Sequence, residues 1–199
     1  IDRSSTTLTI SDLFVIAEQL GCVWKLEKLC RNKALKAAAA KPENVKLFLN
    51  VDGNIIQDKA FIQGFTNRKA MKAGVPASDI VFEITERSDI ENYQILQQIM
   101  KHYADQGYEI ALDDVGAGHS GLNRVVNTTP DYLKADIELV RDIHKYKKKE
   151  IMMKLLLDYC NATGAILIAE GIETAQELEC LHSLGVHYGQ GFFLGKPER

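Results

Sequence analysis

The chain has 199 residues, of which 46% are hydrophobic, and its formal net charge at pH 7 is −3. This length and apolar content suffice for one domain with a buried core, and the charge gives no general attraction to nucleic acid or to anionic membranes. No apolar run is long enough to span a membrane, and no signal peptide is visible. The four cysteines are scattered without a C-x-x-C pair, which predicts free, mostly buried thiols and a cytoplasmic setting.

Two helices are predicted first, one from Ser11 to about Leu20 and one from about Trp24 to Ala40. Apolar runs then predict six strands, at 46–51, 79–85, 108–114, 131–136, 165–170 and 187–193. Helical spacing between these runs predicts helices at about 59–73, 90–107, 120–127, 147–162 and 174–184. In the helix at 147–162, the apolar face is predicted to consist of Ile151, Leu155, Leu156 and Tyr159.

This strict alternation of strands and helices predicts parallel strands joined by right-handed crossovers. Six strands are too few for a (β/α)₈ barrel but enough for an open doubly wound sheet. The strand count alone therefore favours the open sheet, unless about two strands precede Ile1. Because the first residue is not Met, we expect the chain to be an N-terminally incomplete part of a larger protein.

Polar residues stand at or near the C-terminal end of every predicted strand. In chain order they are Asn50, Glu83 with Glu86, Asp113 with Asp114, Lys134 with Asp136, Glu170 with Glu173, and Gln190. The carboxyl ends of parallel strands meet at one edge, and a site crowded with acids ordinarily holds a divalent cation. Hard oxygen ligands suited to Mg²⁺ or Mn²⁺ are offered by Asn50, Glu83, Asp113 and Asp114.

A G-x-G-x-x-G pattern at Gly116, Gly118 and Gly121 is also typical of a dinucleotide-binding turn. Two observations disfavour that interpretation. The next predicted strand begins only about ten residues after Gly121, too soon for a full crossover helix, and the preceding Asp113 and Asp114 would repel a pyrophosphate. We interpret these glycines as a sharp turn between a strand and a short helix.

About residues 8–197 resemble an EAL domain, the family of cyclic di-GMP phosphodiesterases, at the helix segment DLFVIAEQLG (12–21) and at six further segments. The six are LFLNV (47–51), VFEITE (81–86), ALDDVGAGHSGL (111–122), YLKAD (132–136), AEGIET (169–174) and GQGFFLGKP (189–197). The resemblance implies an α/β fold, a TIM-like (β/α)₈ barrel of EAL type whose first strand is antiparallel to the others. The name-giving Glu-Ala-Leu motif, with its strand and its metal-binding Glu, is absent and is expected upstream of Thr9. Val115 and His119 stand where the family usually has Phe and Tyr.

The resemblance also implies two divalent metal ions, Mg²⁺ or Mn²⁺, and a ligand set. Asn50, Glu83 and Asp113 would bind one ion. Asp113 and Asp114 would bind the second, with Asp113 bridging the two. Glu86 would anchor the loop that follows Asp114.

The remaining strand-end residues would act on the substrate. Lys134 would contact the attacking water or the phosphate, Asp136 would orient it, and Glu170 would be the general base. Glu173 and Gln190 would support the metal–water and nucleotide end of the site. The implied reaction is hydrolysis of one phosphodiester bond of cyclic di-GMP, which gives the linear dinucleotide pGpG.

The implied partners are cyclic di-GMP, a second copy of the chain in a homodimer, and a fused sensor or diguanylate cyclase-like domain, but no DNA. The implied location is the cytoplasm or the cytoplasmic portion of a membrane-anchored protein. The alternative function is that of a receptor, which binds cyclic di-GMP or a protein partner without hydrolysis. Degenerate receptors lose the Asp pair, the Lys or the base Glu, all of which this chain keeps, whereas the absent Glu-Ala-Leu motif favours the receptor. For the 199-residue chain alone we expect weak or no activity, because one metal ligand is missing.

Overall fold

The computed structural model describes residues 8–53, 55–84, 93–116 and 121–197. Glu86, Gly118 and His119, which the sequence analysis named, lie outside these residues. Six strands form one sheet: β1 (Leu47–Val51), β2 (Ile80–Ile84), β3 (Glu109–Val115), β4 (Tyr132–Ala135), β5 (Ile166–Ala169) and β6 (Tyr188–Gly189). Each lies within one of the predicted apolar runs or overlaps it to within one residue.

The order of the strands in the sheet is the order of the strands in the chain, and all five pairings are parallel. A doubly wound sheet reverses its strand order at a switch point. Here every crossover steps in the same direction, which is how a barrel is built. The open doubly wound sheet favoured by the strand count is therefore wrong, and the TIM-like arrangement is confirmed. Among the described residues β1 and β6 each pair with one strand only, and the antiparallel first strand is not present.

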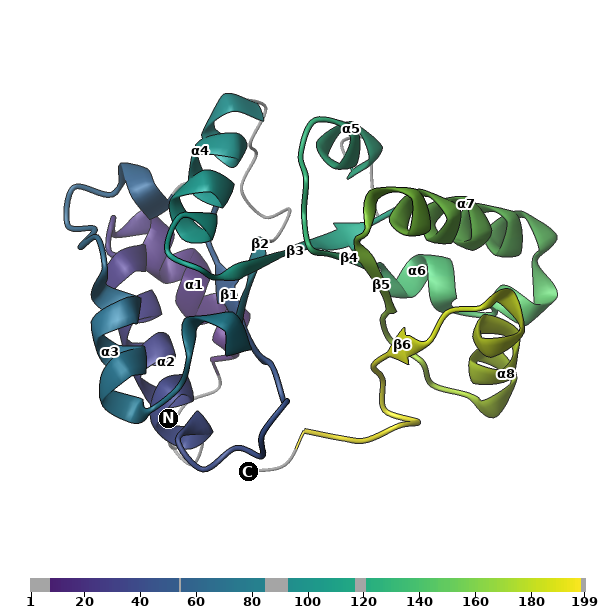
Figure 1. The fold of residues 1–199 in the computed structure, drawn as a ribbon, viewed down its shortest axis with the longest axis horizontal. Helices are drawn as coiled ribbons and strands as arrows, with labels where there is room; N and C mark the ends of the chain where they lie inside the picture. Colours follow the sequence, from purple (N-terminus) through teal and green to yellow (C-terminus); the bar gives the residue numbers. More distant parts are fainter. Residues whose placement is uncertain (1–7, 54, 85–92, 117–120, 198–199) are drawn as a thin grey trace.

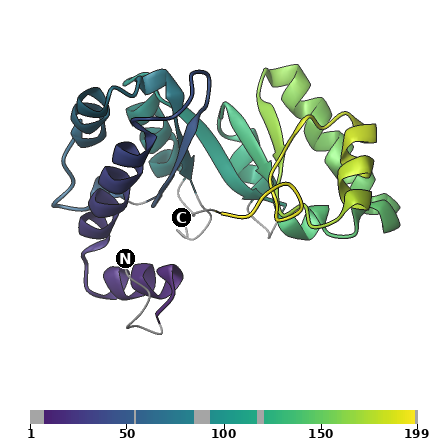
Figure 2. The same cartoon turned by 90° about the horizontal axis from the view of Figure 1, so that it is seen from below.

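The helices are α1 (Ile10–Gln19), α2 (Val23–Ala38), α3 (Phe65–Ala73), α4 (Tyr93–Ala104), α5 (Gly121–Val126), α6 (Ile137–Val140), α7 (Lys147–Thr163) and α8 (Ala175–Leu184). Helices α2–α4 gather beside β1–β3, and α6–α8 lie beside β4–β6 (Figure 1). Figure 2 shows α1 at the periphery, packed on α2. None of the described helices is both long and apolar enough to cross a membrane.

Two helices begin at other residues than predicted. Thr9, not Ser11, caps α1: the Thr9 hydroxyl accepts the N–H of Asp12 at 3.1 Å, and the Asp12 carboxylate accepts the N–H of Thr9 at 2.7 Å. This reciprocal pair is a capping box. Helix α3 begins at Phe65 rather than near residue 59, because a short 3₁₀ turn at Ile55–Gln57 and further turns precede it. The four-residue helix α6 was not predicted.

The predicted apolar face of α7 is partly wrong. Ile151 and Leu155 are 53% and 58% exposed, whereas Met153, Leu156 and Cys160 are buried. The run IMMKLLL is apolar on more than one side of a helix, so its spacing fits several orientations. The cysteine prediction also fails in part, because Cys160 is buried but Cys30 is exposed, although all four thiols are free.

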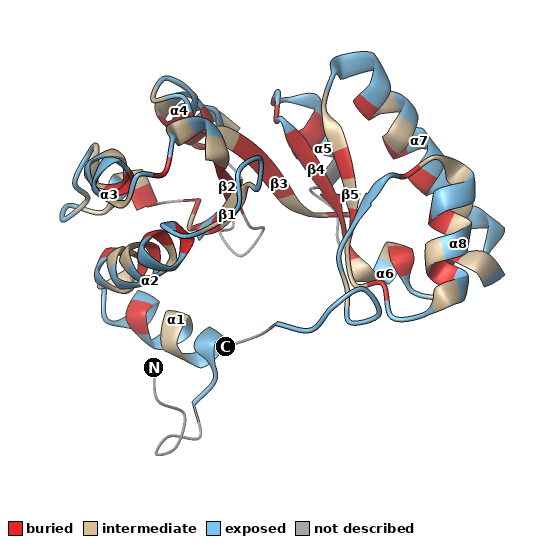
Figure 3. Ribbon diagram, turned by 60° about the horizontal axis from the view of Figure 1, so that its bottom comes forward, coloured by how far each residue is buried: buried red, intermediate tan, exposed pale blue. Residues whose placement is uncertain are grey.

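Buried residues run along the strands and along parts of the helices (Figure 3). They form two clusters, which lie on opposite faces of the sheet because side chains alternate along a strand. The larger cluster joins one face of the strands, including Ile80, Phe82 and Leu112, to the buried sides of the helices. The smaller cluster consists of strand residues alone and lies on the other face, which we call the inner face. Its members are Val81, Ala111 and Tyr132, with Phe48, Ile166 and Ile168 packed against them.

Candidate functional site

The inner-face cluster fixes which way the polar residues at the strand ends point. Side chains alternate along a strand, so residues two positions apart share a face. Phe48, Val81, Ala111, Tyr132 and Ile168 all belong to the inner-face cluster. Two positions beyond them stand Asn50, Glu83, Asp113, Lys134 and Glu170. A single register of alternating side chains therefore carries these polar groups to the C-terminal rim of the inner face.

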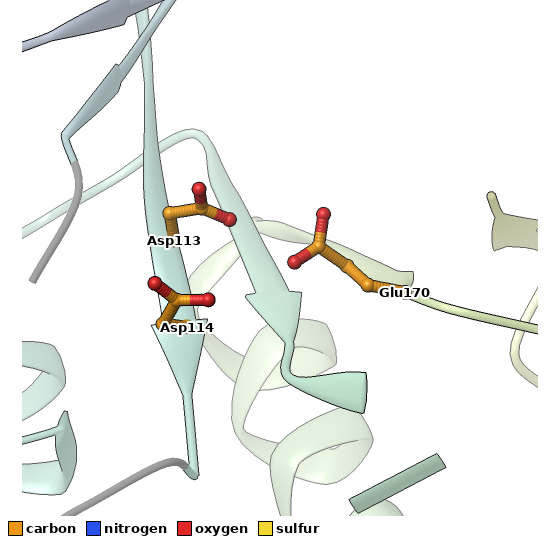
Figure 4. A group of neighbouring side chains, drawn as sticks. All are labelled: Asp113, Asp114 and Glu170. Carbon is orange, nitrogen blue, oxygen red and sulfur yellow. The ribbon is translucent and has the colours of Figure 1, made fainter. Parts of the chain in front are cut away.

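Asp114 follows Asp113 directly and in a regular strand would point to the opposite face. The pairing of β3 with β4 shows why it does not: Leu112 pairs with Leu133 and Val115 with Ala135, so β3 has one more residue than β4 over this interval. This is a β-bulge, and Asp114 takes a left-handed conformation with φ 56°. Figure 4 shows the two aspartates projecting from β3 on the side where Glu170 lies. Gly116, with φ 108°, continues the turn, as predicted.

One ammonium group holds three of the carboxylates. The Nζ atom of Lys134 lies 2.6 Å from Glu83 Oε1, 2.9 Å from Asp113 Oδ1 and 2.5 Å from Glu170 Oε1. The four side chains come from four neighbouring strand ends, and none is more than 13% exposed. The carboxylates Glu83 and Asp113 hold the pKa of Lys134 well above its usual range despite its burial, so the group stays charged.

Carboxylates nevertheless outnumber the ammonium at this rim. Oxygen atoms of Asp113, Asp114 and Glu170 all lie within 4.8 Å of one another (Figure 4). Burial is the main cause that raises the pKa of Glu170 to about 7, and the nearby charge of Asp113 adds to the shift. Burial likewise raises the pKa of Glu83. A set of close, hard oxygen donors with excess negative charge fits a divalent cation such as Mg²⁺ or Mn²⁺.

Asn50 lies at the edge of this group. It is exposed on β1, paired in register with Glu83 of β2. Asn50, Asp113 and Asp114 line a pocket of about 390 Å³, and its opposite wall comes from α1 and includes Phe14 and Val15. The pattern of polar strand ends did not indicate that α1 faces the site.

The other predicted residues divide between two places. Gln190 lies beside Glu170, because its Nε2 atom donates to Glu170 Oε1, and its own N–H donates to Ala169 O at 2.8 Å. Asp136 lies in the turn after β4, where its Oδ1 atom accepts the N–H of Glu138 at 2.7 Å and caps α6. Glu173 is half-exposed and lies 3.9 Å from Arg141.

A second pocket, of about 630 Å³, adjoins the carboxylates. Its walls include Glu173 and Gln190, together with Ile137, Phe192 and Lys196. Phe192 is 62% exposed, and the Lys196 ammonium lies 5.9 Å from the centroid of its ring. The strand-end pattern pointed to Glu173 and Gln190 but not to Ile137, the first residue of α6, or to Lys196, which follows β6 by seven residues.

The match to a protein family is decisive at this point. The family model of the EAL domain matches residues 2–197. The chain belongs to the EAL domain family. It is 27% identical over 191 residues to the cyclic di-GMP phosphodiesterase PdeR of Escherichia coli, covering 94% of this chain and 28% of PdeR. It thus spans less than a third of the length of that relative.

Solved structures of EAL proteins share the fold. BlrP1 of Klebsiella pneumoniae, in a complex with manganese and cyclic di-GMP, is 28% identical with a TM-score of 0.82 over 92% of this chain and 47% of that one. A standalone EAL protein from Vibrio cholerae, bound to cyclic di-GMP, is 26% identical with a TM-score of 0.78 over 97% of this chain and 77% of that one. The carboxylate rim of this chain therefore belongs to a TIM-barrel fold that binds cyclic di-GMP in these similar proteins.

Proposed function

We propose that this EAL domain hydrolyses one phosphodiester bond of cyclic di-GMP to pGpG in a reaction that depends on divalent metal ions. The observation that carries the proposal is the group formed by Lys134, Glu170 and Asp113 at adjacent strand ends. The names of relatives such as PdeR, and the cyclic di-GMP complexes of similar structures, support the substrate.

The metal-binding residues in this proposal are Asn50, Glu83, Asp113 and Asp114. The bulge that turns Asp114 toward Asp113 supports a shared site. When bound, two divalent ions would neutralise the phosphodiester, lower the pKa of a water and stabilise the leaving oxygen. The manganese complex of BlrP1 supports Mn²⁺ as one suitable ion.

The proton transfer is assigned to Glu170. A base is most effective when its pKa lies near the working pH, and the pKa of Glu170 is raised to about 7. The hydrogen bond from Gln190 orients the carboxylate. Lys134, held among the acids, would contact the water or the phosphate and stabilise negative charge. Asp136 stands two residues after Lys134, in the turn where it caps α6. From there it would orient the attacking water.

The pocket of about 630 Å³ is the proposed nucleotide end of the site. Phe192 offers an exposed ring for stacking on a base, and Lys196 offers a positive charge for a phosphate. Glu173 and Gln190 line the same pocket, next to Glu170. Glu86, which the resemblance assigns to the loop after Asp114, lies outside the described residues.

We further propose the homodimer that the resemblance implies. Val126 of α5 is 75% exposed, and Ile151 and Leu155 of α7 are also exposed. The Tyr159 hydroxyl donates to Val125 O at 3.0 Å and joins the two helices. Light scattering after size-exclusion chromatography checks this state, with Leu155→Glu expected to give monomers. A cytoplasmic location and a fused signalling domain remain predictions.

The test of function is a hydrolysis assay with purified full-length protein, Mn²⁺ and cyclic di-GMP. We expect pGpG as product, no product with excess EDTA, and at least about a hundredfold loss of kcat in Glu170→Gln and Asp113→Asn. Lys101→Met, which removes an exposed charge on α4 that is paired with Asp105, is the matched control and should keep full activity. Hydrolysis in the presence of EDTA, or undiminished activity in Asp113→Asn, would refute the enzyme. Tight binding of cyclic di-GMP without hydrolysis would assign the receptor function instead.

A further inference from the structure

A buried ion pair on α2 has no part in the proposed reaction. Glu27 and Arg31 face each other one helical turn apart, and they are only 3% and 2% exposed. A buried ion pair is often no more stabilising than a pair of apolar residues of the same size, because both charges must leave water. Its presence therefore calls for an explanation other than stability.

Arg31 is held by contacts from several elements. Its Nη1 atom donates to the Thr66 hydroxyl at 3.2 Å and to the Tyr103 hydroxyl at 3.1 Å. Its guanidinium carbon lies 5.2 Å from the ring centroid of Trp24 and 5.0 Å from that of Phe82. These contacts come from α2, α3, α4 and β2, so Arg31 is a rigid anchor for whatever its guanidinium group holds.

Arg31 holds Glu27, and Glu27 in turn holds the end of β1. One carboxylate oxygen of Glu27 pairs with Arg31, while the other accepts the backbone N–H of Asp52 at 2.6 Å. Asp52 directly follows the last residue of β1 and stands two positions after Asn50. Glu27 also lines the pocket of about 390 Å³ that contains Asn50, Asp113 and Asp114.

The contact between Glu27 and Asp52 matters because β1 lies at the edge of the described sheet. Among the described strands β1 pairs only with β2, so its other edge receives no hydrogen bonds from the sheet. Its register with β2 places Asn50 beside Glu83. A charge-assisted hydrogen bond to the N–H just beyond the strand restrains the end that presents Asn50.

We propose that Glu27, anchored by Arg31, is a positioning residue that holds the Asn50–Asp52 segment in the geometry required for metal binding. This inference rests on the proposed function, because it assumes that Asn50 is a ligand. Residues that orient ligands through a hydrogen bond typically change metal affinity by about tenfold or more when they are removed.

The decisive variant is the double substitution Glu27→Met with Arg31→Met, which replaces both charges by apolar side chains of similar length. It should fold with a Tm within a few degrees of the wild type, because the paired charges leave together. We expect two effects: faster amide exchange at residues 50–53 in metal-free protein, measured by hydrogen–deuterium exchange, and a Kd for Mn²⁺ raised about tenfold in calorimetry.

The matched control is Tyr103→Phe. It removes one hydrogen bond to Arg31 but leaves the Glu27 contact with Asp52, so exchange at residues 50–53 and the Kd for Mn²⁺ should stay unchanged. If the double variant does not fold, Glu27→Gln is measured in the same way and should raise the Kd about threefold, since a neutral acceptor forms a weaker hydrogen bond.

Wild-type exchange rates or wild-type Mn²⁺ affinity in the folded Glu27 variant would overturn the inference while leaving the proposed function intact. Failure of the wild-type protein itself to bind Mn²⁺ would overturn the proposed function, and the inference with it. The two failures are therefore distinguishable by the behaviour of the wild type.

Discussion

Lys134 Nζ lies 2.5 Å from Glu170 Oε1, and the same ammonium bridges Glu83 of β2 and Asp113 of β3. The proposed base is thus held by the cation that is proposed to contact the substrate. One positive charge at the centre of this rim limits the repulsion among several buried carboxylates.

We therefore predict that Lys134→Met destabilises the metal-free protein by about 3 kcal/mol at pH 7.5, because it leaves buried carboxylates without their counter-charge. Urea denaturation followed by circular dichroism measures the change. Lys101→Met, which breaks an exposed pair with Asp105, should change stability by less than about 0.5 kcal/mol. Equal effects of the two substitutions would contradict a structural role for the Lys134 ammonium.

The raised pKa of Glu170 predicts how stability depends on pH. An ordinary glutamate has a pKa of 4.5, whereas that of Glu170 in the folded protein is about 7. Between these values the folded state holds a proton that the unfolded state has lost, so stability falls as the pH rises from about 4.5 to 7. Raised pKa values at Glu83 act in the same direction.

Glu170→Gln cannot titrate and isolates this contribution. Thermal unfolding of metal-free protein should show a larger loss of Tm between pH 5 and pH 7.5 in the wild type than in Glu170→Gln, by a few degrees. Added Mn²⁺ should reduce the difference, because a cation bound beside Glu170 favours its ionised carboxylate. Parallel Tm curves for the two proteins without metal would be inconsistent with a raised pKa at Glu170.

The left-handed backbone of Asp114 predicts a ranking of substitutions. Asn tolerates this conformation better than Ala does, so Asp114→Ala should be less stable than Asp114→Asn by about 1 kcal/mol. Both variants remove the same charge, so relief of carboxylate repulsion cancels in the comparison. Both should lose Mn²⁺ affinity in calorimetry. A more stable Ala variant in urea denaturation would argue against strain at the bulge.

Gly191 is required for a different reason, the close approach of two backbones. A Cβ atom at this position would lie 2.1 Å from Ile172 O, in the segment after β5, and Ile172 N donates to Gln190 O at 3.0 Å. Gly191→Ala should therefore cost about 2 kcal/mol and displace Gln190 from Glu170, lowering kcat more than it changes KM. Stability by urea denaturation and steady-state kinetics check both effects. Gly195→Ala, where an added Cβ meets nothing within 4 Å, should be as stable as the wild type.

The strands could be predicted from the sequence because buried parallel strands are short apolar runs, and the runs around Phe82, Leu112 and Leu133 have no competing helical pattern. The polar residues at the strand ends could be predicted as well, because they stand where these apolar runs end. The number of strands, by contrast, favoured an open doubly wound sheet, which is wrong. What separates the two folds is the order of the strands, and that order leaves no periodicity in the sequence.

Long-range contacts account for what the sequence did not reveal. The bulge at Asp114 depends on the register with β4, and the contact between Glu27 and Asp52 joins residues 25 positions apart. Apolar residues stand on several sides of α7, so its own sequence does not determine which side is buried. Packing against the sheet determines it. The three-way contact of Lys134 likewise requires four strand ends to meet.

Because strand order follows chain order, each strand and its following helix form one unit that delivers its own side chains to the rim. A substitution of one strand-end side chain leaves the pairing of the strands intact, because main-chain hydrogen bonds make that pairing. Loss of Glu170 alone would thus remove the proposed base while keeping the pocket beside Phe192 and Lys196. If Glu170 is the base, as proposed, a single substitution at this position would separate an enzyme from a sensor of the same nucleotide.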